Sequence, residues 1–162
     1  MTNNEKFELL LKKHNLSITH YIRYVYLLEN EQNEILFIHK TQKSNETTLY
    51  LGWQIFSETY WGCDWDDEDI LDLAKGVIQQ FTELSLNVSD IKLVHLDKDT
   101  NPHEILHIVY YVKFTDTSNF EFWYEFDKEA VWLKKDNALE LLDFSIDKAI
   151  INLNHISLQN LL

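Results

Sequence analysis

The amino-acid sequence predicts one α/β domain, built from a mixed sheet with flanking helices. β-rich runs occur in both halves of the chain, and a helix with one apolar face lies between them. The 162 residues, 45% of them hydrophobic, are enough for one buried core. We find no linker or internal repeat, so residues 1–162 are expected to form a single domain.

The chain is predicted to begin with a helix and a hairpin. Phe7, Leu10 and Leu11 have helical spacing, which predicts a helix within residues 1–16. Two apolar runs, Tyr21–Leu28 and Ile35–His39, flank a polar turn and are typical of a hairpin. Leu49–Phe56 is predicted to be the next strand, and the aromatic segment Tyr60–Trp65 is predicted to be a loop.

Asp66–Glu83 is the most regular segment, with apolar residues at i, i+4, i+7, i+8 and i+11 from Ile70. This spacing predicts an amphipathic helix, for which Asp66 would be the N-cap. Beyond it, four runs have strand composition: Ile91–Leu96, Ile105–Thr115, Phe120–Phe126 and Ala130–Leu133. We expect Phe120–Phe126 to pair with Ile105–Thr115. Two helices follow, Asp136–Leu142 and Ser145–Gln159, the second within residues 145–160.

The charge balance is strongly acidic. Twenty-seven acids against fourteen bases give a formal net charge of −13, and Arg23 is the only arginine. Proteins that bind nucleic acids present a basic surface, so direct nucleic-acid binding is not expected. The acidity would suit solubility, metal binding, a basic protein partner or mimicry of nucleic acid.

Nothing in the sequence predicts secretion or membrane insertion. The N-terminal segment lacks the apolar stretch of a signal peptide, and no run has the ~20 apolar residues of a spanning helix. Cys63 is the only cysteine, so no intramolecular disulfide can form. We therefore expect a cytoplasmic protein.

The order of these elements resembles the Nudix hydrolase fold between residues 20 and 145. Tyr21–Lys40 is similar to the family's opening hairpin, Gly52-Trp53-Gln54-Ile55 to its tryptophan strand, and Asp66–Glu83 to its catalytic helix. Glu129-Ala130-Val131-Trp132-Leu133 resembles the family's late strand. The resemblance implies an α/β/α sandwich.

The Nudix motif itself is degenerate in this chain. The family pattern is Gly, five residues, Glu, seven residues, Arg-Glu, an apolar residue, any residue, Glu-Glu, any residue, Gly and an apolar residue. Gly62 and Glu68 keep the first spacing, but Gly76-Val77 then replaces Arg-Glu, and Gln80-Phe81 replaces Glu-Glu. Two shifted registers recover only Lys75 or Glu83, so the usual diphosphate hydrolase site is expected to be lost.

Several side chains near this helix could replace the lost metal ligands and catalytic groups. The candidate metal ligands are carboxylates: Asp66, Asp67, Glu68, Asp69 and Glu83. Mg²⁺ or Mn²⁺ would be the cation, and Glu83 and Glu68 the candidate catalytic groups. The alternative is that the acids near residue 66 belong to a solvated loop and the first helical turn, where acids are favourable.

The candidate ligand-binding residues lie on the same helix or near it. They are two aromatic, two amide and two basic side chains: Trp61, Trp65, Gln79, Gln80, Lys75 and Lys40. Aromatic rings in this region could stack on a nucleobase. His103 and His107 also match a zinc-protease spacing. That site needs a helix, whereas this run has strand composition and would separate the two histidines by ~13 Å.

These observations favour a non-hydrolytic Nudix-like domain that binds a nucleotide-like ligand or a protein partner. A metal-dependent nucleoside diphosphate hydrolase with substitute carboxylates is the first alternative. An acidic interaction protein, inhibitor or nucleic-acid mimic is the second.

Overall fold

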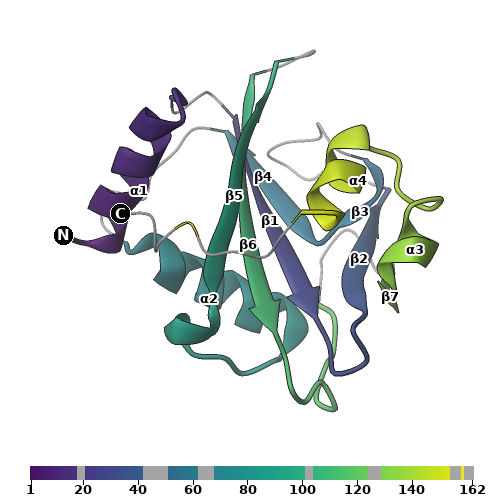
Figure 1. Ribbon diagram of the computed structural model, residues 1–162. Helices are drawn as coiled ribbons and strands as arrows, with labels where there is room; N and C mark the ends of the chain where they lie inside the picture. Colours follow the sequence, from purple (N-terminus) through teal and green to yellow (C-terminus); the bar gives the residue numbers. More distant parts are fainter. Residues whose placement is uncertain are drawn as a thin grey trace.

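The computed structural model describes residues 1–17, 21–41, 51–61, 68–100, 104–123, 129–153 and 158. Seven strands form one mixed sheet, with α1 and α2 on one face and α3 and α4 on the other (Figure 1). The predicted α/β/α arrangement is confirmed. Within the described residues, no helix is both long and apolar enough to cross a membrane.

The helices and strands follow a simple order. α1 (Asn3–Lys13), β1 (Tyr21–Glu29), β2 (Ile35–Lys40), β3 (Gly52–Ile55), β4 (Ser57–Trp61) and α2 (Ile70–Thr82) form the first half. A short 3-10 helix (Val88–Asp90), β5 (Lys92–Asp99), β6 (Ile105–Lys113), β7 (Glu129–Leu133), α3 (Lys135–Ala138) and α4 (Ser145–Ile151) form the second.

Strand β1 is the centre of the sheet. It runs parallel to β6 over its whole length and antiparallel to β4 over its first half, while β2 pairs with β3 and β7. Phe56 connects β3 to β4. Its N–H donates to Leu36 O of β2, and its carbonyl accepts from Tyr26 N of β1. The apolar strands predicted from residues 21–39 therefore occupy the interior.

Side chains on the two faces of β1 belong to two separate hydrophobic cores. Ile22, Tyr26 and Leu28 pack with the helices on the α1 and α2 face, whereas Val25 and Leu27 pack with residues of α3 and α4. Successive side chains of a strand point to opposite faces, so one strand serves both layers. Helices on both faces explain why the β-rich runs are nearly continuous apolar sequences rather than alternating ones.

Two predicted segments are wrong in the described structure. Tyr60 and Trp61 belong to strand β4, where they pair with Ile22 and Tyr21, and not to a loop. Residues 120–123 form no strand: the N–H groups of Glu121 and Trp123 donate instead to Thr82 O and Phe81 O at the end of α2. The carbonyls of a helix end need partners, and this segment supplies them.

Several boundaries also differ from the prediction. The cap of α2 is Asp69, whose side chain accepts from Leu71 N and Asp72 N, and not Asp66. The strand expected over Leu49–Phe56 is confined to Gly52–Ile55 among its described residues, α3 has only four residues, and α4 ends at Ile151 instead of Gln159.

Candidate functional site

The helix α2 is held at both ends by contacts outside itself. At its start, Asn4 of α1 accepts from Ile70 N at 2.8 Å and donates to Glu68 O at 2.8 Å. At its end, Glu83 has the left-handed conformation (φ 58°), and the buried residue Leu84 follows. The face of α2 that contains Ala74 and Ile78 is buried against the sheet.

This geometry fits one register of the Nudix motif. The register that begins at Gly62 and Glu68 places Ile78 and Leu84 on the two apolar positions, and both are buried. It also places Glu83 on the motif's final glycine, a residue type that the left-handed conformation favours. In this register Val77 stands at the glutamate of the motif's Arg-Glu, and Gln80 and Phe81 stand at its paired glutamates.

The candidate carboxylates are not all gathered in one place. Glu68 precedes α2 and Glu83 ends it, so the thirteen-residue helix keeps them roughly 20 Å apart. Asp69 is engaged in capping the helix. Asp66 and Asp67 lie outside the described residues. Among the residues that the structure describes, no three His, Cys, Asp or Glu side chains are arranged to hold a metal ion.

The described candidate ligand-binding residues lie on α2, at the end of β2 and in β4. Lys75 and Gln79 are half-buried, and Gln80 is exposed. Lys40, at the end of β2, donates to Ser57 O at 2.8 Å. Trp61 is placed only by its backbone in β4, and Trp65 lies outside the described residues.

Glu58 of β4 is a further carboxylate, not predicted from the sequence, and it lies on the α2 face of the sheet. Only 7% of Glu58 is exposed, it pairs with Tyr24 across the strands, and its carboxylate accepts from the Tyr60 hydroxyl. Burial, and then the charge of Glu58, raise the pKa of Tyr26 well above its ordinary value. Predicting a loop at residue 60 concealed the strand alternation that would have revealed this carboxylate.

The single arginine is buried on the opposite face. Arg23 binds Asp147 of α4 through both terminal nitrogens, at 2.6 and 2.8 Å, and donates to Ser57 Oγ at 3.2 Å. Asp147 also accepts from Ile55 N at 2.9 Å. Arg23 and Asp147 have no exposed side-chain surface, so this guanidinium is committed within the protein and does not face a ligand.

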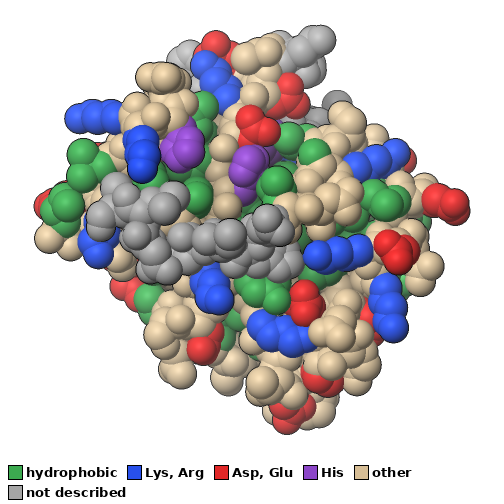
Figure 2. All heavy atoms as spheres, in the orientation of Figure 1, with side chains coloured by type: hydrophobic (Ala, Val, Ile, Leu, Met, Phe, Trp, Pro, Cys, Tyr) green, Lys and Arg blue, Asp and Glu red, His purple; other side chains and the backbone are tan. Residues whose placement is uncertain are grey.

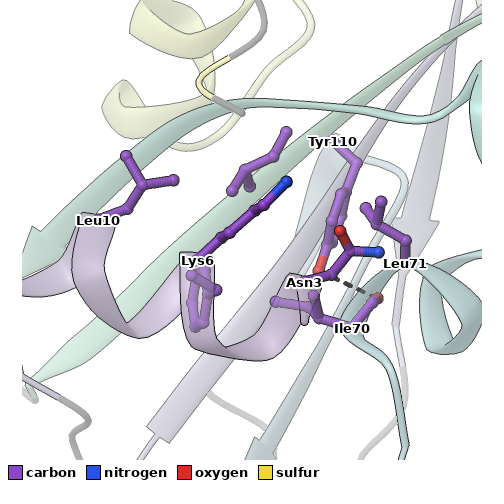
Figure 3. A pocket seen from close by; sticks show the side chains of 8 residues that line it. Asn3, Lys6, Leu10, Ile70, Leu71 and Tyr110 are labelled. Carbon is purple, nitrogen blue, oxygen red and sulfur yellow. Dashed lines mark hydrogen bonds between the residues drawn. The ribbon is translucent and has the colours of Figure 1, made fainter. Parts of the chain in front are cut away.

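A pocket opens between α1 and α2, with Tyr110 at its floor (Figure 3). Its other lining residues are mainly apolar: Phe7, Leu10, Ile70, Leu71 and Leu93, with Asn3 and Lys6 from α1. None of the residues predicted from the sequence to bind a ligand or metal lines this pocket. The pocket is therefore separate from Val77, Gln80 and Phe81, the residues at the motif positions of α2.

The comparison with known proteins identifies the fold. No protein-family model and no curated protein sequence matches the chain. Among solved structures, the NUDIX domain of Shewanella oneidensis NrtR complexed with ADP ribose is similar, with a TM-score of 0.62, 10% identity, and coverage of 93% of this chain and 95% of that one.

Two further structures illustrate the range of the similar proteins. The MutT protein from Methanosarcina mazei Go1 has a TM-score of 0.56 and 17% identity, covering 82% of this chain and 89% of that one. The C-terminal domain of mouse MUTYH, in a complex with human PCNA, has a TM-score of 0.58 and 10% identity, covering 88% and 97%. Together with the topology described above, these similarities show that the chain has a Nudix-like fold.

Proposed function

We propose that this chain is a non-hydrolytic Nudix-like domain that binds a nucleotide-like ligand or a protein partner. The observation that carries the proposal is the identity of Val77, Gln80 and Phe81 at the motif positions of α2. None of these side chains is charged, and a divalent cation held against a diphosphate needs carboxylate oxygens. Nudix hydrolysis depends on a bound metal that polarises the phosphorus and activates the attacking water. Without these carboxylates, α2 would not hold that metal.

Both kinds of binding have a parallel among the similar structures. The NrtR domain is described with ADP ribose and the MUTYH domain with PCNA, a protein. For this chain, the burial of Arg23 against Asp147 favours a protein partner. Arginine is the side chain that usually binds phosphate in a bidentate manner, and the sequence contains no second arginine.

Mimicry of nucleic acid is less well supported. On the face shown in Figure 2, lysine side chains lie interspersed with Asp and Glu. A mimic would need a continuous acidic strip, which this face does not present. The excess of acids over the whole sequence supports solubility, and the single Cys63 accords with a cytoplasmic location.

The test is a hydrolysis assay of the purified chain with ADP-ribose, dinucleoside polyphosphates and nucleoside triphosphates, each with Mg²⁺ or Mn²⁺. We expect no product above the protein-free control. Metal-dependent turnover that falls in Glu83→Gln or Glu58→Gln would overturn the proposal and establish a hydrolase with substitute carboxylates. Glu140→Gln, a change at an exposed acid beyond α3, is the matched control.

Ligand binding is measured separately, by thermal shift with the same compounds. A compound whose free concentration is a hundred times its dissociation constant raises the free energy of unfolding by about 2.7 kcal/mol. A shift without metal would assign a nucleotide-like ligand. A flat panel would assign the binding function to a protein partner.

A further inference from the structure

Trp123 is a large aromatic residue left on the surface. Its side chain is 55% exposed, and it follows Phe122, which packs edge-on against Phe56 with ring centroids 5.8 Å apart. Isolated exposed apolar residues are common. Trp123 differs because its backbone is fixed to the end of a helix.

The backbone around Trp123 is hydrogen-bonded to the last turn of α2. Trp123 N donates to Phe81 O at 2.8 Å, and Glu121 N donates to Thr82 O at 3.1 Å. These hydrogen bonds fix the backbone that carries the indole. An anchored aromatic residue loses little conformational entropy when a partner binds, which is a property of interface hot spots.

Two acidic residues adjoin the backbone contact between Trp123 and α2: Glu121 precedes Phe122, and Glu83 follows Thr82. Glu83 and Glu121 are both exposed, and the last turn of α2 contains no basic residue. The C-terminal end of a helix is itself the negative end of its dipole. An exposed indole beside two carboxylates and a helix C-terminus is suited to a cation, above all a guanidinium that can stack on the ring and bind a carboxylate.

We infer that the surface formed by Glu83, Glu121 and Trp123, here termed the Trp123 surface, binds an arginine-bearing segment of a protein partner. The inference rests on the proposed binding function and names the chemistry of the partner. A second copy of the chain is disfavoured because each copy carries a net charge of −13 and its only arginine is buried. Nucleic acid is disfavoured because its phosphates would meet the two glutamates.

The experiment measures binding of a fluorescein-labelled peptide of four Arg-Gly repeats by anisotropy, at 50 and 150 mM NaCl. Lys-Gly and Glu-Gly peptides of the same length are the comparison probes. We expect the arginine peptide to bind more tightly than the lysine peptide, and the glutamate peptide not to bind. Trp123→Ala should weaken the arginine peptide about tenfold, as should the double change Glu83→Gln with Glu121→Gln.

Matched variants separate a specific surface from general attraction between acids and bases. Glu8→Gln with Glu140→Gln removes the same charge from exposed positions elsewhere, and Leu9→Ala removes an exposed apolar side chain from α1. These should leave the affinity within about twofold. Equal losses in all the variants, or no loss in Trp123→Ala, would overturn the inference.

Self-association is tested in the same preparation by sedimentation. A dimer that dissociates in Trp123→Ala would assign the surface to a second copy and overturn the inference in favour of that interface. Circular dichroism checks that Trp123→Ala remains folded, as expected for a half-exposed side chain. Failure of peptide binding would leave the hydrolysis result untouched, so the two proposals fail separately.

Discussion

Arg23 of β1 and Asp147 of α4 form an ion pair without solvent exposure, although they lie 124 positions apart in the sequence. Both terminal nitrogens of the arginine reach the carboxylate, and Ile55 N donates to the same group. The pair joins the central strand, the β3 strand and the last described helix. It therefore fixes α4 against the sheet, on the face opposite α2.

Asp147→Ala should lower the free energy of unfolding by about 3–5 kcal/mol, because it leaves a buried guanidinium without its counter-charge. Urea denaturation followed by circular dichroism measures this. Asp136→Ala, at an exposed position of α3, is the control and should change stability by less than about 0.5 kcal/mol. The double variant Arg23→Met with Asp147→Leu should recover most of the loss. If Asp147→Ala were as stable as the control, the pair would not be what holds α4.

His107 lies beside Arg23 in the sheet, paired with it across β1 and β6. Burial, followed by the positive charge of Arg23 and then by His95, lowers the pKa of His107 to about 3. An unfolded histidine has a pKa of ~6.5, so below that pH the unfolded chain takes up a proton that the folded chain does not. Stability should fall as the pH decreases from about 6.5 toward 3, by up to about 1.4 kcal/mol per unit from this residue.

The measurement is the free energy of unfolding in urea at pH 7, 6 and 5. His107→Leu should have a shallower decrease between pH 6 and 5 than the unchanged chain. His14→Gln, at an exposed position after α1, should keep the original slope. Identical slopes in all three proteins would mean that His107 does not resist protonation in the fold.

Part of the fold could be predicted from the sequence because local signals and tertiary packing agree there. The apolar stripe of α2 and the β-rich runs of β1, β2 and β6 needed no further information. Residues 120–123 could not be predicted in this way. Their aromatic composition is that of a strand, but the carbonyls of Phe81 and Thr82 capture their N–H groups, a contact that only the folded chain supplies.

The arrangement of the candidate site could not be predicted from the sequence alone. Spacing alone left three motif registers open, and the left-handed conformation of Glu83 and the burial of Ile78 favour one of them. Glu58 could not be predicted because the segment that follows it has the composition of a loop, whereas Ser57–Trp61 is a strand. Side-chain direction depends on strand pairing, and the sequence does not state which strands pair.

Glu83→Gly should raise the free energy of unfolding by about 1 kcal/mol, because a left-handed conformation costs a side chain that much and costs glycine almost nothing. Thermal and urea unfolding measure the gain. Gly76→Ala is the reverse change inside the same helix. A Cβ there meets nothing within 4 Å, so it should also stabilise, by about 0.5–1 kcal/mol. A loss in Glu83→Gly would indicate that the Glu83 side chain makes a contact worth more than the strain.

Val77→Glu with Gln80→Glu should create a metal site that the unchanged chain does not have. Residues three apart on a helix lie about 5–6 Å apart, close enough for two carboxylates to share one divalent cation. We expect Mn²⁺ to bind this variant at least tenfold more tightly than the unchanged chain, by calorimetry. Val77 is half-buried and Gln80 exposed, so the variant should still fold.

Lys75→Glu is the control for that variant, because it also places two acids three apart on α2, with Asp72. The motif register puts no metal ligand at either position, so its gain in Mn²⁺ affinity should be smaller. Equal gains in the two variants would mean that any acidic pair on this helix attracts the cation. A gain confined to positions 77 and 80 would mean that the surroundings of a Nudix metal site persist around α2, and that the loss of carboxylates there is what separates this chain from a hydrolase.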